Sequence, residues 1–136
     1  MARFVKHILP VVLTVLLLCV LCGGCGGDNV AQDSYRQIGQ DAAYEMMSEQ
    51  EVIVLDVREQ DEYDSGHIPG AVLLPVGIID EDSAAAVIPD RDAVVLVYCR
   101  SGNRSKTAAE ALAELGYTSV YEFGGINTWP YDIIVD

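Results

Sequence analysis

The sequence has few basic residues, with 8 Lys and Arg against 21 Asp and Glu and a formal net charge of −13 over 136 residues. This balance argues against nucleic-acid binding, which relies on Lys and Arg clusters that face phosphates. It also argues against docking on anionic lipid through a basic surface. Internal repeats and low-complexity blocks are lacking, which excludes collagen-like and repeat architectures. Hydrophobic residues make up 51% of the chain, so the composition excludes a disordered chain and the length indicates one domain.

Charge is absent from residues 8–22, ILPVVLTVLLLCVLC. At 1.5 Å per residue this run would span roughly 22 Å as a helix, which is less than the ~30 Å core of a bilayer. Arg3 and Lys6 precede the run, and the small residues Gly23 and Gly24 follow it. A basic start, a short apolar run and a small-residue exit are typical of a secretory signal. A short uncleaved membrane anchor is the alternative.

The exit of this run, Leu21-Cys22-Gly23-Gly24-Cys25, resembles the lipobox of bacterial lipoprotein signals. The resemblance implies a signal peptide over residues 1–24, lipidation of Cys25, a tether over residues 25–34 and a domain over residues 35–136. Cys22 departs from the pattern, in which Leu is usual at that position. In bacterial lipoproteins, an Asp directly after the lipidated Cys favours retention in the inner membrane. This chain has Gly26 at that position. We therefore expect an exported protein, lipid-anchored on the periplasmic face of a bacterial membrane, with the outer membrane favoured.

Cysteine is scarce, and its four positions are Cys19, Cys22, Cys25 and Cys99. Cleavage before Cys25 would remove the first two and lipidation would occupy the third, so Cys99 would be the only free thiol. Exported proteins usually pair their cysteines in disulfides, which makes a lone thiol a candidate for chemistry. A buried structural cysteine is the alternative. The sequence has no Cys/His cluster for a metal, so no metal site is expected.

Helical and strand patterns alternate along the rest of the chain. The patterns predict strands over 52–55, 71–74, 93–98 and 120–123, and helices over 40–48, 59–65, 82–87 and 104–115. Apolar residues recur with helical spacing in the last helix, and the AVVLVY run is the strongest strand. Strands separated by helices predict an α/β fold with a parallel sheet and right-handed crossovers.

The segment 94–105, VVLVYCRSGNRS, places Cys99 where a buried strand gives way to a loop and a helix. Ligands of open α/β sheets bind at the carboxyl ends of the strands. The loop residues Ser101, Gly102 and Asn103 allow tight turns, so their N–H groups and the helix N-terminus could form a cradle for an anion. The same field favours thiolate over thiol, which predicts a lowered pKa for Cys99.

Basic residues gather beside this thiol in an otherwise acidic chain. These residues are Arg100, Arg104 and Lys106. Two other basic residues, Arg3 and Lys6, belong to the predicted signal peptide. A solvated start of a helix would explain three charges of one sign without any function. Their position next to the one expected free thiol instead favours the binding of an anion.

Several motifs, taken in order, resemble those of the single-domain rhodaneses, which are thiosulfate sulfurtransferases. They are VLDVR at 54–58 with Glu62-Tyr63, GHIPGA at 66–71 followed by Pro75, CRSGNRS at 99–105, and GGI at 124–126 with Trp129. The resemblance covers residues 35–136 and implies an α/β, rhodanese-like fold: a five-stranded parallel sheet flanked by helices on both faces. It also implies that Cys99 is the nucleophile and carries a transient persulfide, with no metal or organic cofactor.

The resemblance gives the other matched residues their roles. The loop that would bind the donor comprises Arg100, Ser101, Gly102, Asn103, Arg104 and Ser105. Asp56 and Arg58 are interpreted as structural, with substrate contact as the alternative. His67 is interpreted as part of a turn packed on the sheet, with a catalytic base as the alternative. Trp129 is either a core aromatic or a wall of the pocket.

The expected reaction is a double displacement, because a nucleophile that is modified covalently divides the transfer into two steps. Cys99 would take a sulfane sulfur from thiosulfate or a related small anion and pass it to a thiol or to cyanide. One alternative is a Cys-based phosphatase or arsenate reductase, although those phosphatase loops resemble C-x5-R and Cys99 to Arg104 is C-x4-R. Another is an exported sulfur-relay or binding module. We expect a monomer, and the physiological donor, acceptor and protein partner stay open.

Overall fold

The computed structural model describes residues 35–136, and the predicted signal peptide, Cys25 and the whole of the predicted tether lie outside the described residues. The elements are β1 (Arg36–Gln37), α2 (Gln40–Glu49), β2 (Ile53–Asp56), α3 (Gln60–Asp64), β3 (Val72–Leu73), η1 (Val76–Ile78), α4 (Glu81–Val87), β4 (Val94–Cys99), α5 (Asn103–Glu114), β5 (Ser119–Gly125) and η2 (Ile126–Thr128). Every strand and helix predicted from the sequence pattern is present, with ends shifted by at most two residues, whereas that pattern did not predict β1.

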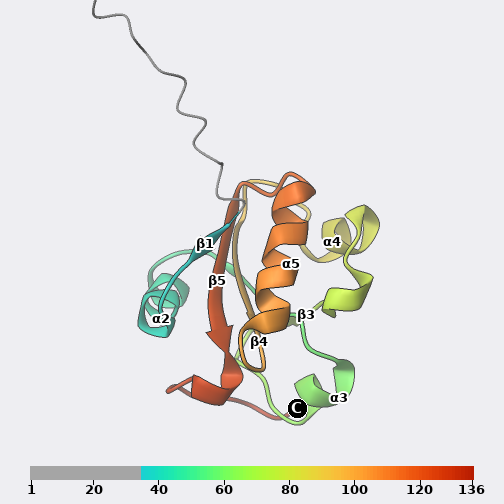
Figure 1. Ribbon diagram of the computed structural model, residues 1–136. Coiled ribbons are helices and arrows are strands. Elements are labelled where there is room, and N and C mark those ends of the chain that lie inside the picture. The colour runs from blue at the N-terminus through green and yellow to red at the C-terminus, as the bar shows by residue number, and fades with distance from the viewer. Residues whose placement is uncertain (1–34) are drawn as a thin grey trace, which may run out of the picture. The chain divides into compact units, whose positions relative to one another are not determined.

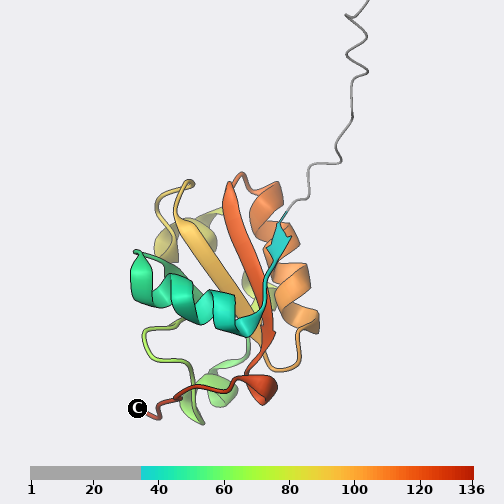
Figure 2. The same cartoon turned by 90° about the vertical axis from the view of Figure 1, so that its left-hand side faces the viewer.

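The five strands form one parallel sheet with the order β1-β5-β4-β2-β3. Helix α2 covers one face of the sheet, and α4 and α5 cover the other (Figures 1 and 2). The predicted α/β fold with helices on both faces is therefore confirmed. Among residues 35–136, no helix combines the length and apolarity needed to cross a bilayer.

The apolar run of β4 is continuous because both of its faces are buried. Val95 and Val97 point to the core beneath α5, with Leu112. Leu96 and Tyr98 point to the opposite core, beneath α2. Because side chains alternate along a strand, Cys99 lies on the α5 face, at the carboxyl end of β4.

The pairing of β4 with β5 changes register at the end that carries Cys99. Val97 pairs with Glu122, but Cys99 pairs with Gly125, so β5 holds one more residue than β4 across this stretch. Such a bulge lets a strand redirect its side chains next to a site. Since Glu122 pairs with Val97, its side chain lies on the α5 face, the face that carries Cys99.

Candidate active site

The thiol of Cys99 is buried at the start of the loop to α5, and the residue is 1% exposed. Sequence analysis placed Cys99 just after its strand, whereas it is the last residue of β4. The backbone N–H of Gly102 donates to Cys99 Sγ at 3.0 Å. Gly102 caps α5 with φ +101°, a conformation that a residue with a Cβ rarely adopts. This glycine lets the chain turn its N–H groups back toward the sulfur and begins α5 at Asn103, so Arg104 lies in the first helical turn.

The surroundings of the thiol favour its ionised form. Burial raises the pKa of Cys99, but the hydrogen bond with the Ser105 side chain and those with the backbone of Ser105, Gly102 and Ser101 together lower it by more. The pKa of Cys99 therefore lies below its usual value, in the direction predicted from the sequence. The thiolate is the nucleophilic form of cysteine, so this arrangement favours the more reactive form of Cys99.

The side chain of Arg104 is held by α3. Arg104 Nη1 and Nη2 donate to Glu62 Oε2 and Oε1 at 2.7 and 2.8 Å, a bidentate pair. Glu62 is itself oriented by the capping box of α3, because the backbone N–H of Glu59 donates to Glu62 Oε2 at 3.0 Å. The bond from Arg104 lowers the pKa of Glu62 to about 2. The Arg104 side chain is 33% exposed, so it borders solvent while it is paired.

The remaining residues of the predicted donor loop lie at different depths. Ser105 is fully buried beside Cys99, with its Oγ 3.4 Å from Cys99 Sγ. Arg100, Ser101 and Asn103 are exposed at the surface, as is Lys106. The structure thus brings Gly102 and Ser105 to the sulfur and leaves the basic side chains of Arg100 and Lys106 toward solvent.

Sequence reasoning missed Glu122, a buried carboxylate that is linked to the thiol by two hydrogen bonds through Ser105. Glu122 is 3% exposed, and its Oε1 accepts from Ser105 Oγ at 2.6 Å and from Gly124 N at 2.8 Å. An acidic residue within the predicted strand over 120–123 was the available signal, because a charge that becomes buried in a sheet needs a partner. Glu122 and Lys106 both border a cavity of about 360 Å³ beside the loop.

The pair Gly124-Gly125 allows β5 to pass close beneath the loop. A Cβ at Gly125 would overlap the carbonyl group of Arg100, although the backbone angles of Gly125 are ordinary for any residue. The loop is also fixed by a bond from Asn127 N to Arg100 O at 3.1 Å. Gln40 Nε2 donates to Gly125 O at 2.8 Å, which ties α2 to the same turn. The close approach of the two backbones therefore sets the height of the loop above the sheet.

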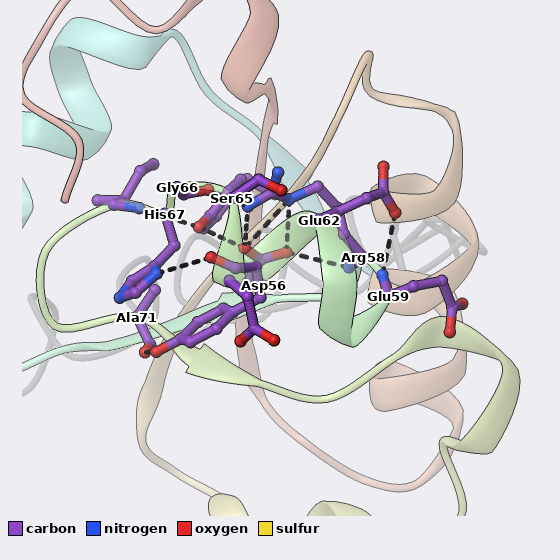
Figure 3. Close-up of polar contacts among 12 residues, drawn as sticks. Asp56, Arg58, Glu59, Glu62, Ser65, Gly66, His67 and Ala71 are labelled. Carbon is purple, nitrogen blue, oxygen red and sulfur yellow. Dashed lines mark hydrogen bonds and ion pairs between the residues drawn. The ribbon is translucent and has the colours of Figure 1, made fainter. Parts of the chain in front are cut away.

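Asp56 and Arg58 form a buried ion pair at the end of β2 (Figure 3). Asp56 accepts bonds from the backbone N–H and the guanidinium of Arg58, and Tyr98 Oη donates to Asp56 Oδ2 at 2.6 Å. Burial and Asp56 together raise the pKa of Tyr98. Arg58 Nη2 also donates to Gly66 O at 2.8 Å, so the pair joins β2 and β4 to the turn after α3.

His67 is 2% exposed and is enclosed by α3 and the C-terminal residues. Its ring stacks on Tyr63 with centroids 3.7 Å apart, and Nδ1 lies 3.0 Å from Tyr63 O (Figure 3 shows His67 beside α3). Its backbone exchanges two hydrogen bonds with Ile134, and Nε2 lies 3.3 Å from the Asp136 carboxylate. These contacts surround His67 with the C-terminal segment and α3, and none of them involves the loop at Cys99.

Trp129 packs in an aromatic group on the α2 face. Its ring centroid lies 5.5 Å from Phe123, 6.2 Å from Tyr44 and 5.0 Å from Tyr131. Trp129 is partly buried against the core of the α2 face. In the part of the chain that the structure describes, no group of three or more His, Cys, Asp or Glu side chains is arranged to hold a metal ion.

Comparison with known proteins identifies the family. The model of the rhodanese-like domain matches residues 39–130. The chain belongs to the rhodanese family. It is 38% identical over 96 residues to thiosulfate sulfurtransferase GlpE of Coxiella burnetii, covering 70% of this chain and 87% of the relative. It is 42% identical over 72 residues to thiosulfate sulfurtransferase PspE of Escherichia coli, covering 53% of this chain and 68% of the relative.

Solved structures agree with this membership. A rhodanese with anions from E. coli is 31% identical with a TM-score of 0.59, covering 63% of this chain and all (100%) of that one. A rhodanese-related protein from Thermoplasma volcanium is 32% identical with a TM-score of 0.60, covering 75% of this chain and 100% of that one. The family and fold predicted from the ordered motifs are confirmed, and this rhodanese is an enzyme of the sulfurtransferase class.

Proposed function

We propose that this rhodanese moves a sulfane sulfur from thiosulfate, or a related anionic donor, to a thiol or cyanide through a persulfide on Cys99. The observation that carries the proposal is the setting of Cys99, the one free cysteine among residues 35–136. Its thiol faces backbone N–H groups that lower its pKa, at the end of a parallel strand where ligands bind. The names of the relatives from Coxiella burnetii and Escherichia coli support thiosulfate as the donor.

The first step is attack by the Cys99 thiolate on the outer sulfur of thiosulfate. A bond forms between Cys99 Sγ and that sulfur, the S–S bond of the donor breaks, and sulfite leaves with the electron pair. The product is a persulfide anion on Cys99. The N–H groups of Ser101, Gly102 and Ser105 that favour the thiolate would stabilise negative charge on the sulfurs throughout this step.

The second step returns the enzyme to its starting state. Cyanide or a thiolate attacks the outer sulfur of the persulfide, the S–S bond breaks, and its electron pair returns to Cys99 as the thiolate. Dividing the transfer in this way is covalent catalysis, and it consumes no oxidant, reductant or cofactor.

In this proposal the donor binds at the loop between Cys99 and α5 and at the first turn of α5. Arg104 is the donor's cationic partner in this proposal, and Glu62 competes with the donor because it already accepts two bonds from Arg104. Arg100 and Lys106 add positive charge at the surface of a protein with net charge −13. Exposed positive charge in that position raises the local concentration of an anionic donor.

Mass spectrometry of the purified protein tests the proposal directly. Incubation with thiosulfate should add one sulfur atom to the peptide that contains Cys99, and later addition of cyanide should remove it. Cys99→Ser, which is nearly isosteric, should keep the circular dichroism spectrum and lose both the sulfur gain and thiocyanate formation. Absence of sulfur on wild-type Cys99, or transfer that persists in Cys99→Ser, would overturn the proposal.

The placement of the enzyme is a second part of the proposal, and it is supported by the sequence of residues 1–34. We infer that Cys25 carries the lipid and that residues 25–34 tether the domain to the periplasmic face of a bacterial membrane, with the outer membrane favoured. More than one acyl chain is needed for stable anchoring. Labelling with a fatty acid should mark the wild type and Cys22→Ala but not Cys25→Ala, and label on Cys25→Ala would exclude this assignment.

A further inference from the structure

Three buried side chains form a line from the thiol into the end of β5. Cys99, Ser105 and Glu122 are 1%, 0% and 3% exposed. Ser105 Oγ lies 3.4 Å from Cys99 Sγ on one side and 2.6 Å from Glu122 Oε1 on the other. Gly124 N fixes the same carboxylate oxygen at 2.8 Å. The Ser105 hydroxyl is therefore the only described side chain that bonds both the thiol and the carboxylate.

A serine hydroxyl has one proton, so it can donate to only one of these two neighbours at a time. The separation of 2.6 Å from Glu122 is typical of an O–H group that donates to a carboxylate. With its proton directed to Glu122, Ser105 presents a lone pair to the sulfur and accepts the S–H of a neutral thiol. A thiolate needs the opposite orientation, because the Ser105 hydrogen bond lowers the pKa of Cys99 only when its proton points to sulfur.

We propose that Glu122 is a positioning residue that sets the ionisation of Cys99 by holding the hydroxyl proton of Ser105. The inference rests on Cys99 being the reactive thiol of the proposed function. Glu122 opposes thiolate formation in two ways: it engages the hydroxyl that would otherwise donate to the sulfur, and its own negative charge lies near the sulfur. The backbone N–H groups act in the other direction, so the acidity of the thiol is a balance between the loop and β5.

The other charged groups around this line come from three elements. Arg104 from α5 and Arg100 from the loop are cationic, and Glu62 from α3 offsets Arg104 through their ion pair. Lys106 from α5 borders the cavity that Glu122 also borders. Gln40 of α2, which borders it too, is neutral. Glu122 differs from all of them because it alone, among the described charged side chains, accepts a bond from the residue that contacts the sulfur.

The test measures the alkylation of Cys99 by iodoacetamide as a function of pH, in the absence of any sulfur donor. The full-length chain is used in detergent, and labelling is followed on the peptide that contains Cys99. Glu122→Gln keeps the shape and an acceptor oxygen but loses the charge. We expect its inflection to move to lower pH by about one unit, because a hydrogen bond to a charged group is commonly worth at least that much.

The matched control is Glu114→Gln, which removes the same charge from an exposed position near the other end of α5. This control should leave the inflection where it is in the wild type. An unchanged inflection in Glu122→Gln, or one that moves to higher pH, would overturn the proposal. If Glu122→Gln does not fold, Glu122→Asp takes its place, because the shorter side chain withdraws the carboxylate from Ser105. The inflection should again move to lower pH. An unchanged inflection in Glu122→Asp would overturn the proposal.

The route through Ser105 has its own test. In a Ser105→Ala background, Glu122→Gln should shift the inflection by less than half as much as it does with Ser105 present. An equal shift in both backgrounds would mean that Glu122 acts through space alone, which overturns the positioning role. Alkylation does not depend on sulfur transfer, so failure of the persulfide experiment and failure of this one are separate results.

Discussion

Replacing Gly125 with alanine tests whether the close approach of β5 sets the geometry of the catalytic loop. The backbone angles of Gly125, φ −134° and ψ 157°, suit alanine, so the substitution introduces no strain in its own dihedrals. The added Cβ would overlap the carbonyl of Arg100 and lie 2.5 Å from Ser101 N. Both clashing groups are backbone, and no side chain can turn aside to relieve them.

The size of the effect follows from this overlap. Ordinary van der Waals contact begins near 3.4 Å, so the loop has to rise by about 1 Å, and a displacement of that size at a catalytic site can cost about 100-fold in rate. The bond from Gly102 N to Cys99 Sγ, now 3.0 Å, would lengthen and weaken. We therefore expect kcat/KM for sulfur transfer from thiosulfate to cyanide to fall by about 100-fold.

Steady-state kinetics and circular dichroism together measure this outcome. Gly77→Ala is the matched control, because a Cβ at Gly77 would meet nothing within 4 Å and its φ is not in the left-handed region. Gly77→Ala should keep wild-type activity. A folded Gly125→Ala enzyme with activity within about threefold of the wild type would refute the reasoning, because a 1 Å loop displacement would then be harmless.

Three further predictions concern the surroundings of the site. Glu62→Gln should lower the apparent KM for thiosulfate several-fold in steady-state assays, because the neutral amide releases Arg104, and an unchanged KM would contradict this. Tyr98→Phe should lower the free energy of unfolding, measured in urea, by about 2–3 kcal/mol. The substitution removes a hydrogen bond to the Asp56 carboxylate and leaves the Ile68 N–H without its acceptor. A loss below about 1 kcal/mol would argue against this reasoning. Because the pKa of Glu62 is lowered from 4.5 to about 2, its ion pair stabilises the fold above pH 4.5 and loses this effect as the pH falls toward 2. Any stability difference between wild type and Glu62→Gln in urea should therefore vanish over that range, and a difference that persists at pH 2 would contradict it.

The sequence predicts the fold well wherever local pattern determines the structure. The uninterrupted apolar run of β4 and the helical spacing of α5 are strong signals, and both elements lie within one residue of their predicted bounds. Strand β1 carries no such signal, because it is two exposed residues that are a strand only through pairing with Tyr121 and Glu122. Its existence depends on contacts between distant parts of the chain, and no local pattern records them.

The same distinction separates the predicted from the missed residues of the site. Cys99 and its loop lie in one continuous motif, so their proximity follows from the sequence. Arg104 and Glu62 are 42 positions apart, and Ser105 and Glu122 are 17 apart. The first pair depends on how α3 docks, and the second depends on how α5 packs on the face of the sheet that carries Glu122. Alternation along a strand shows that Val120 and Glu122 share a face of the sheet but does not show which of the two faces it is.

The motifs distant from Cys99 act on the loop through α3. Arg58, paired with Asp56, donates to Gly66 O in the turn that follows α3, and α3 presents Glu62 to Arg104. A buried ion pair adds little net stability, but removing one partner is costly, commonly about 3–5 kcal/mol. Its value here is therefore positional: it fixes α3 and through it the first turn of α5. Since β5 fixes the loop from the other side, Gly102 N–H can stay directed at the sulfur during the two steps of the proposed transfer, which is the condition for preorganised stabilisation.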